Sequence, residues 1–401
     1  MRLIIFALAR VIWPHIAASA DPLIGQRLFM KEGVNAKIEN TFVDRMTIPF
    51  PATVGEVEGE WLWLERAWVR KSDTMPPQVA LNHFTEEIRK FPLSLSGWAS
   101  RGAVWDELGQ RNAAIGDYTE AIRLNPLDST SYYNRAISRK ANGELDLAIS
   151  DFCQAISLMP RYSAAYCGRG ATELQKGQID AALKDLNQAV ALESNNLYNF
   201  YSRGIVWLEK RDLDNALNDF TESIKLNKKF GLAYGHRANF WQMKCNFDRA
   251  IDDYTTAIKL VPDPAILFVY RGLAFRHKGE SDKALADYDA AVKLSPQNPE
   301  AYNAIAWHAA TNPEKQSLHD TNAVWYAIRA CELSEWRTWY CVGTLAAAYA
   351  DSGDFANATR WASKSVELAP EAERFRASER LELYRMGKPY RVKPDNGPLN
   401  I

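Results

Sequence analysis

Residues 129–162 read STSYYNRAISRKANGELDLAISDFCQAISLMPRY, and residues 163–196, which follow directly, read SAAYCGRGATELQKGQIDAALKDLNQAVALESNN. When the two stretches are aligned over their 34 positions, small residues stand at positions 8, 20 and 27 of both. A large apolar residue stands at position 24 of both. Self-similarity at a fixed period indicates a repeat protein, in which one supersecondary unit recurs along the chain.

The same spacing continues without a slip over six repeats, which begin at residues 95, 129, 163, 197, 231 and 265. Gly or Ala at position 8 and Ala at position 20 let two helix axes approach to about 8–10 Å. Position 24 supplies a large side chain, and Pro at position 32 of four repeats ends the second helix. We therefore predict a helix, a turn and a second helix in each repeat. Position 24 is occupied by Tyr118, Phe152, Leu186, Phe220, Tyr254 and Tyr288.

Further segments extend the array on both sides. Residues 299–338 form a seventh repeat, with about five extra residues around 312–318 before a second helix at Ala323–Leu333. Residues 339–372 form an eighth repeat, residues 373–390 contain a capping helix, and residues 391–401 are a tail. Upstream, residues 76–94 have the apolar spacing of a second helix alone, so we expect a half-repeat that caps the N-terminal face of the array.

An aromatic column completes the pattern, because position 4 is Tyr132, Tyr166, Phe200, Tyr234, Phe268 and Tyr302 in the repeats that begin at 129 to 299. Together these columns resemble the tetratricopeptide-repeat (TPR) family, from residue 95 to the capping helix. The resemblance implies a mostly α fold, a right-handed superhelical solenoid of about eight repeats. It also implies that a concave groove holds a protein or peptide, normally without catalysis. The sequence departs from the family at position 7, where Arg replaces the usual Leu.

This departure is accompanied by an Asp at position 23 of the same six repeats. One interpretation is a ladder of arginines that binds an acidic ligand. The other is a structural ion pair, since an Arg at a half-buried site needs a partner to offset its desolvation. The repeats at 299 and 339 lack both members, which favours an ion pair within each repeat. The pairs are Arg101 and Asp117, Arg135 and Asp151, Arg169 and Asp185, Arg203 and Asp219, Arg237 and Asp253, and Arg271 and Asp287.

The TPR resemblance places the groove on the first helix of each repeat, at positions 2, 5, 9, 12 and 13. These positions are mostly apolar and aromatic in the middle repeats, which suits a peptide with hydrophobic anchors. The alternative for each residue is packing against a neighbouring helix. The subclass of the family that clamps a terminal carboxylate with Lys and Asn at positions 5 and 9 is not matched. The candidate groove residues are Tyr133, Ile137, Tyr198, Tyr201, Ile205, Leu208, Leu232, Asn239, Gln242, Met243, Val269, Arg276 and His277.

The N-terminus resembles a secretory signal. Arg2 precedes an apolar run, and the small residues Ala18 to Ala20 precede Asp21, which predicts a signal peptide at residues 1–20 and a periplasmic or secreted protein. Arg10 interrupts the apolar run, so a mis-assigned start, with a cytoplasmic protein, and a short membrane anchor stay open as alternatives. No later segment is apolar enough to span a membrane.

Residues 21–75 have the texture of short strands. The turn at residues 57–60 predicts a hairpin, and Trp61 and Trp63 alternate with leucines as in a half-buried strand. The segment resembles a bacterial SH3-like barrel, which implies binding of wall peptides or proline-containing segments on an aromatic surface. Alternatively, these tryptophans fill the core of a small barrel.

Composition argues against several functions. The chain has 48 Lys and Arg against 49 Asp and Glu, a net charge of -1, so no global field attracts nucleic acid or an anionic membrane. Its six histidines and five cysteines show no catalytic or metal-ligand spacing, so we expect no cofactor and no metal. Cys153 with Cys167 and Cys331 with Cys341 could form disulfides after export, but free buried thiols are preferred.

Three functions follow from these patterns. We expect a non-catalytic scaffold whose groove binds a protein or peptide. The alternative is a cell-envelope protein that recognises wall peptides through the SH3-like module and uses the repeats as an adaptor. A hydrolase would need a pair of carboxylates in a closed cleft, and the sequence shows no such pair.

Overall fold

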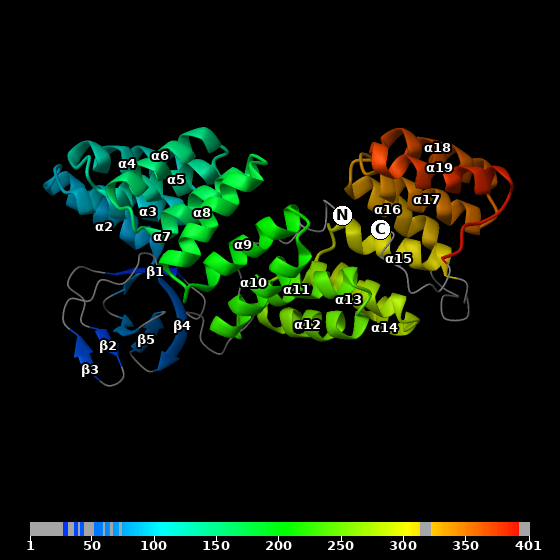
Figure 1. The fold of residues 1–401 in the computed structure, drawn as a ribbon, viewed down its shortest axis with the longest axis horizontal. Helices are drawn as coiled ribbons and strands as arrows, with labels where there is room; N and C mark the ends of the chain where they lie inside the picture. Colours follow the sequence, from blue (N-terminus) through cyan, green and yellow to red (C-terminus); the bar gives the residue numbers. More distant parts are fainter. Residues whose placement is uncertain are drawn as a thin grey trace. The chain divides into compact units, whose positions relative to one another are not determined.

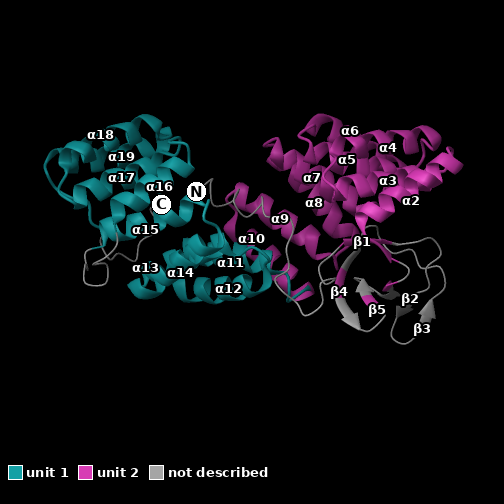
Figure 2. Ribbon diagram, turned by 180° about the vertical axis from the view of Figure 1, so that it is seen from behind, with its two compact units in different colours: residues 1–13, 227–401 teal, residues 14–226 magenta. Residues whose placement is uncertain are grey.

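The computed structural model describes residues 27–30, 36–38, 41–43, 52–58, 61–64, 67–71, 74–312 and 322–392. The chain forms two compact units, residues 14–226 and residues 227–401 together with 1–13, here called the N-terminal and C-terminal units (Figure 1, Figure 2). The predicted signal peptide, the insertion at 313–318 and the end of the tail from 393 lie outside the described residues.

The helices of the N-terminal unit begin where the 34-residue count places them. A single helix precedes four helix pairs, in agreement with the predicted half-repeat and first four repeats (Figure 1). Their bounds are α2 Pro77–Lys90, α3 Leu95–Glu107, α4 Arg111–Leu124, α5 Ser129–Ala141, α6 Leu145–Leu158, α7 Ser163–Gln175, α8 Ile179–Leu192, α9 Leu197–Glu209 and α10 Leu213–Leu226.

Among its described residues, the C-terminal unit contains four more pairs and a last single helix. This helix buries Ala377, Leu381 and Tyr384, as expected of a capping helix that packs on α18. The bounds are α11 Gly231–Met243, α12 Phe247–Leu260, α13 Ala265–His277, α14 Ser281–Leu294, α15 Pro299–Thr311, α16 Ala323–Leu333, α17 Trp339–Asp351, α18 Phe355–Leu368 and α19 Glu371–Arg385.

The turn between the two helices of a repeat requires a left-handed backbone at position 15. Glycine holds this position in five repeats, with φ between 73° and 86°. Arg211 and Cys245 adopt the same conformation with φ of 63° and 57°. Because a side chain in this region costs roughly 1–2 kcal/mol, the turns at 211 and 245 are less favourable than the glycine turns. The glycines are Gly109, Gly143, Gly177, Gly279 and Gly353.

The predicted contact between small and large columns is confirmed. A Cβ atom added to Gly204 would lie 2.8 Å from the ring of Phe220, the position 24 residue of the same repeat. At Gly272 it would lie 2.5 Å from the ring of Tyr288. The alanines at position 20 are fully buried in all six regular repeats, so the two helices of each repeat are in close contact.

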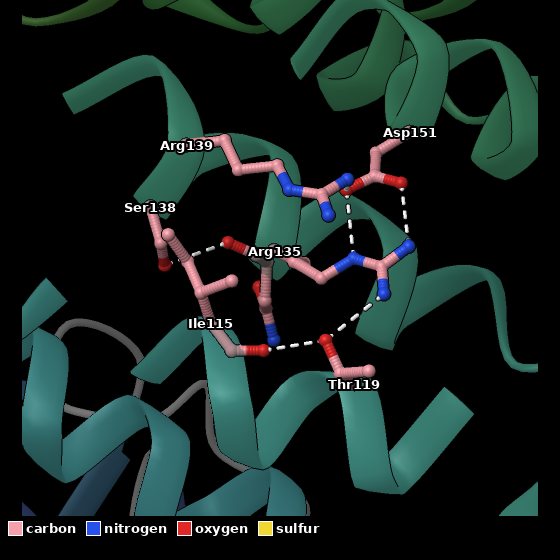
Figure 3. A network of polar contacts seen from close by, with 7 residues as sticks. Ile115, Thr119, Arg135, Ser138, Arg139 and Asp151 are labelled. Carbon is pink, nitrogen blue, oxygen red and sulfur yellow. Dashed lines mark hydrogen bonds and ion pairs between the residues drawn. The ribbon is translucent and has the colours of Figure 1, made fainter. Parts of the chain in front are cut away.

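The ion pair within each repeat is also confirmed. In the repeat at 129, Nε and Nη2 of Arg135 donate to Oδ2 and Oδ1 of Asp151 at 2.8 and 2.7 Å (Figure 3). The other five pairs have the same bidentate geometry, with distances of 2.5 to 2.8 Å. All six aspartates are buried. These guanidinium groups are therefore occupied inside the repeat and do not form a ladder for an acidic ligand.

Each arginine of these pairs also makes contacts beyond its aspartate. Its guanidinium lies over the aromatic ring at position 4, with Arg135 at 5.6 Å from the ring centroid of Tyr132. In four of the six repeats the Nη1 atom also donates to a side chain of the preceding repeat, as from Arg135 to Thr119 at 3.1 Å and from Arg271 to Thr255 at 2.9 Å. The pair thus joins the two helices of its repeat, and in these four repeats it also links the repeat to its predecessor.

The described residues before α2 form seven short strands, joined in the order β3-β2-β6-β5-β4-β1-β7. Within the strand residues that the structure describes, all pairings are antiparallel, and the predicted SH3-like barrel is not shown. Phe29 and Met75 pack on Ala80 and Phe84 of α2, which attaches the strands to the array. The bounds are β1 Arg27–Met30, β2 Ala36–Ile38, β3 Thr41–Val43, β4 Ala52–Glu58, β5 Trp61–Leu64, β6 Ala67–Arg70 and β7 Thr74–Met75.

A double-mutant cycle on Arg203 and Asp219 tests the structural role of the pair. Either Arg203→Leu or Asp219→Leu should lower the free energy of unfolding by about 3 kcal/mol, because each leaves one half-buried charge without its partner. The double variant should be close to neutral relative to the wild type. Denaturant unfolding of the full chain measures the three values. Equal losses in all three variants would contradict a structural pair.

The helix contact at position 8 makes a second prediction. Gly204→Val should cost about 1–3 kcal/mol of stability, because the added methyl groups meet the ring of Phe220. Gly204→Ala is the smaller step and should cost less than Gly204→Val, because the Phe220 ring must make room for one added carbon only, and Ala136 beside Phe152 shows that another repeat accepts one at this position. Thermal unfolding distinguishes the two variants. A similar loss of stability for both would show that Phe220 does not limit the size of the side chain at position 204.

Candidate partner-binding surface

The first helices of successive repeats form a wall within each unit. In the N-terminal unit α3 contacts α5, α5 contacts α7, and α7 contacts α9. In the C-terminal unit α11 contacts α13, α13 contacts α15, and α15 contacts α17. Positions 5 and 9 are four residues apart and lie on the same face of a helix. Each wall therefore carries one row of side chains from every repeat, and the two walls are described separately.

In the N-terminal unit, the candidate residues at positions 2, 5 and 9 reach solvent. Tyr198 is 57% exposed and Ile137 is 37% exposed. Tyr133, Tyr201 and Ile205 are half-buried. The ring of Tyr133 packs at 5.1 Å from that of Tyr162, so this aromatic side chain is held in place before any ligand arrives. The wall of this unit is apolar and partly preformed.

In the C-terminal unit, four candidate residues are half-buried and reach solvent in part. They are Leu232, Met243, Arg276 and His277. The ring of His277 stacks on Phe247, with the ring centroids 4.9 Å apart and the planes inclined by 5°. Burial, with a smaller contribution from Arg276, lowers the pKa of His277 to about 4. This histidine is neutral near pH 7, so the charge of this region comes from Arg276.

Four other candidate residues belong to the interior. Leu208, Asn239, Gln242 and Val269 are buried. The hydroxyl of Tyr254 donates to Gln242 Oε1 at 2.9 Å and also binds Asn239 Oδ1. Their polar groups therefore satisfy a buried tyrosine, and their groove assignment is corrected to a packing role. The sequence pattern could not separate the two roles because one helix face serves both.

Sequence reasoning overlooked two polar residues at groove position 12 itself, Asp106 and Lys140. Lys140 stands at position 12 of its repeat, and burial lowers the pKa of its ammonium group. Burial also raises the pKa of Asp106, at position 12 of the first repeat, although Ser138 and Tyr118 donate hydrogen bonds to it. The changing chemistry of position 12 was the available signal. That column reads Asp106, Lys140, Leu174, Leu208, Gln242 and Arg276.

The described residues contain no group of three or more His, Cys, Asp or Glu side chains that could hold a metal ion. All five cysteines lie within the described ranges and are free thiols. Cys331 and Cys341 are buried, as the sequence suggested, whereas Cys153 is exposed. In the part of the chain that was searched, no helix has the length and apolar character needed to cross a membrane.

Comparisons with known proteins address the array itself. Two tetratricopeptide-repeat family models match, one over residues 106–162 and 246–299 and the other over residues 163–196. No curated protein sequence matches this chain.

Solved structures give the same result for the fold. The chain is similar to a chain of the APC/C hetero-tetramer Cut9-Hcn1, with 20% identity and a TM-score of 0.52 over 57% of this chain and 45% of that one. It spans less than half of that relative. It is also similar to YrrB, titled a TPR protein with an unusual peptide-binding site, with 24% identity and a TM-score of 0.39 over 47% of this chain and 96% of that chain. A third is pilF of Pseudomonas aeruginosa, with 16% identity and a TM-score of 0.47 over 52% of this chain and 94% of that chain.

The family models match repeats in which the small residue at position 8, the large residue at position 24 and the aromatic ring at position 4 make the contacts described above. The matched residues, 106–196 and 246–299, therefore carry tetratricopeptide repeats.

Proposed function

We propose that the protein is a non-catalytic scaffold that binds a protein or peptide partner on the walls formed by its first helices. The observation that carries the proposal is the exposed apolar row on α5 and α9, where Ile137 and Tyr198 reach solvent beside half-buried tyrosines. TPR arrays typically serve as interaction scaffolds. Aromatic side chains give a large contact area at a low cost in conformational entropy, which suits them to anchor a partner.

The packing of the repeats supports a surface that is rigid before binding. The ion pairs fix the two helices of each repeat, and the position 4 rings are covered by guanidinium groups. A preformed wall loses little entropy when a partner docks, because few of its side chains must be ordered. Binding then depends on the side chains at positions 2, 5 and 9 of the wall.

A cell-envelope role is the second candidate. It rests on the predicted signal peptide and on the strands that precede α2. In these strands Trp63 and Trp68 are paired across β5 and β6, and Trp61 is paired with Arg70. If this segment recognises wall peptides, the full chain should sediment with isolated cell wall and the Ile137 and Tyr198 substitutions described next should not affect it. N-terminal sequencing of the native protein tests cleavage after Ala20.

A paired substitution on the wall tests the scaffold function. The double variant Ile137→Asp, Tyr198→Asp should capture at least tenfold less of each partner than the full wild-type chain does, because charges replace the apolar anchors. Affinity capture followed by quantitative mass spectrometry measures the loss. Thermal unfolding should be almost unchanged, since both side chains are exposed.

The matched control is Leu147→Asp, on the second helix α6, where the side chain is 49% exposed. This variant should capture the same partners as the wild type. If the wall variant and the Leu147 variant retain the same partners in the same amounts, the first-helix wall is not the binding surface.

A further inference from the structure

A buried tyrosine hydroxyl at position 24 finds its acceptor at position 12 of the same repeat. In the first repeat, the hydroxyl of Tyr118 donates to Asp106 Oδ2 at 3.2 Å. Ser138, at position 10 of the next repeat, donates to the same oxygen at 2.7 Å. In the fifth repeat, the hydroxyl of Tyr254 lies at 2.9 Å from Gln242 Oε1 at position 12 and at 2.5 Å from Asn239 Oδ1 at position 9, and both oxygens are acceptors. Positions 24 and 12 of one repeat and position 10 of the next therefore meet at one point.

The sixth repeat breaks this rule. Its tyrosine, Tyr288, is 0% exposed, and its hydroxyl has no hydrogen-bond partner among the described residues. Position 12 is Arg276, which has only N–H donors and cannot accept a hydrogen bond from the tyrosine. Position 10 of the next repeat is His308, which is 1% exposed. The neutral ring of His308 carries one donor and one acceptor nitrogen, and neither makes a hydrogen bond among the described residues.

The other polar groups at this point also lack hydrogen-bond partners. The ring of His308 lies 6.3 Å from that of Tyr288, edge to face, and both ring nitrogens are buried without a partner in the described part of the chain. Arg276 Nη1 is buried and equally without a partner. An unsatisfied buried polar group costs about 1–3 kcal/mol, and a charged one costs more. Arg276 Nη1, the Tyr288 hydroxyl and the protonated ring nitrogen of His308 would each gain from an acceptor placed between them.

The neighbouring carboxylates are already in use. Glu280 pairs with Lys278 at 3.0 Å and with Lys283 at 2.6 Å. Asp287 is held by both nitrogens of Arg271 at 2.8 and 2.7 Å. The missing acceptor is therefore not supplied by these groups. The helix α13 ends at His277, so the partial negative charge of its C-terminus offsets some of the cost of holding a cation here without a counter-ion.

The net charge of the cluster selects the class of ligand. Burial, together with the charge of Arg276, lowers the pKa of His308 to about 4, as it does for His277. Both histidines are neutral at pH 7, and the arginine contributes the cluster's one positive charge. A carboxylate is a single negative charge and fits the planar guanidinium with two hydrogen bonds, whereas a phosphate dianion would exceed the charge available.

One side of the cluster lies at the first-helix wall. Arg276 and His277 are half-buried and lie on the last turn of α13, at positions 12 and 13 of that wall. Tyr288 and His308 are enclosed, and Arg276 Nη1 is buried as well. A ligand that approaches from the wall would meet Arg276 first, and side-chain movement of Arg276 must open the way to the hydroxyl and the imidazole.

We propose that Arg276, Tyr288 and His308 form a binding site for one carboxylate group of the partner, either an acidic side chain or a chain terminus. This inference rests on the proposed scaffold function and adds to it the chemistry of one anchor. The site uses positions 12, 24 and 10, so it is a different arrangement from a clamp built of Lys and Asn at positions 5 and 9.

The probe is sodium propionate, added to the full chain at constant ionic strength. Propionate should raise the thermal midpoint and shift the ring NMR signals of His308 in a saturable way, and the neutral analogue propionamide should do neither. Arg276→Gln should weaken propionate binding at least tenfold. This variant should fold, because Gln242 occupies the same position beneath Tyr254, and without propionate it should be at least as stable as the wild type.

Arg329→Gln is the matched control. It removes one positive charge from the same unit, at an exposed pair with Glu332, and should leave propionate binding unchanged. The proposal is overturned if the wild type shows no saturable response, or if Arg276→Gln responds as the wild type does. A response to inorganic phosphate but not to propionate would overturn the carboxylate assignment.

The result can be separated from the test of the scaffold function. If propionate does not bind while the substitutions at Ile137 and Tyr198 still abolish partner capture, the wall binds a partner and the carboxylate site is wrong. If propionate binds through Arg276 while those substitutions change nothing, the site exists and the partner-binding surface must be sought elsewhere.

Discussion

The close approach of two helices within each repeat is the constraint on which the rest of this array depends. A glycine or alanine at position 8 faces the large side chain at position 24, and at Gly204 or Gly272 there is no room for one more carbon without movement. Because the helices are so close, the side chains beside this contact are enclosed as well. Burial at positions 7, 12 and 23 follows from it, and so does the need to satisfy every polar group there.

The arginine and aspartate pair solves this problem for positions 7 and 23. A bidentate pair satisfies the aspartate, the ring at position 4 covers the guanidinium, and the third nitrogen reaches the preceding repeat in several cases. The arginines that the sequence alone could assign to a ligand-binding ladder are instead paired with aspartates inside each repeat. The surface available for a partner is consequently formed by the apolar side chains of the first helices and by polar groups that the packing leaves without partners.

Position 12 shows how one location can serve structure in one repeat and a ligand in another. Asp106 and Gln242 each accept a hydrogen bond from the tyrosine of their own repeat, and the contact is complete. Arg276 occupies the same place with the opposite hydrogen-bonding character, and the contact is incomplete. The difference lies in two side chains, Arg276 at position 12 and His308 at position 10 of the next repeat, while the backbone follows the same 34-residue plan.

The order of the amino acids was sufficient to place the helices and the ion pairs, because both depend on spacing that is local to one repeat. The first helices begin at the predicted residues, and the second helix of the seventh repeat has the predicted bounds Ala323–Leu333. The sequence could not decide whether Tyr198 and Gln242 line the groove or pack against a neighbouring helix. Exposure depends on which neighbouring helices cover a side chain. Folding leaves Tyr198 exposed and buries Gln242 against Tyr254. The unsatisfied hydroxyl of Tyr288 likewise arises from side chains of three helices, α13, α14 and α15, that meet only when the repeats stack.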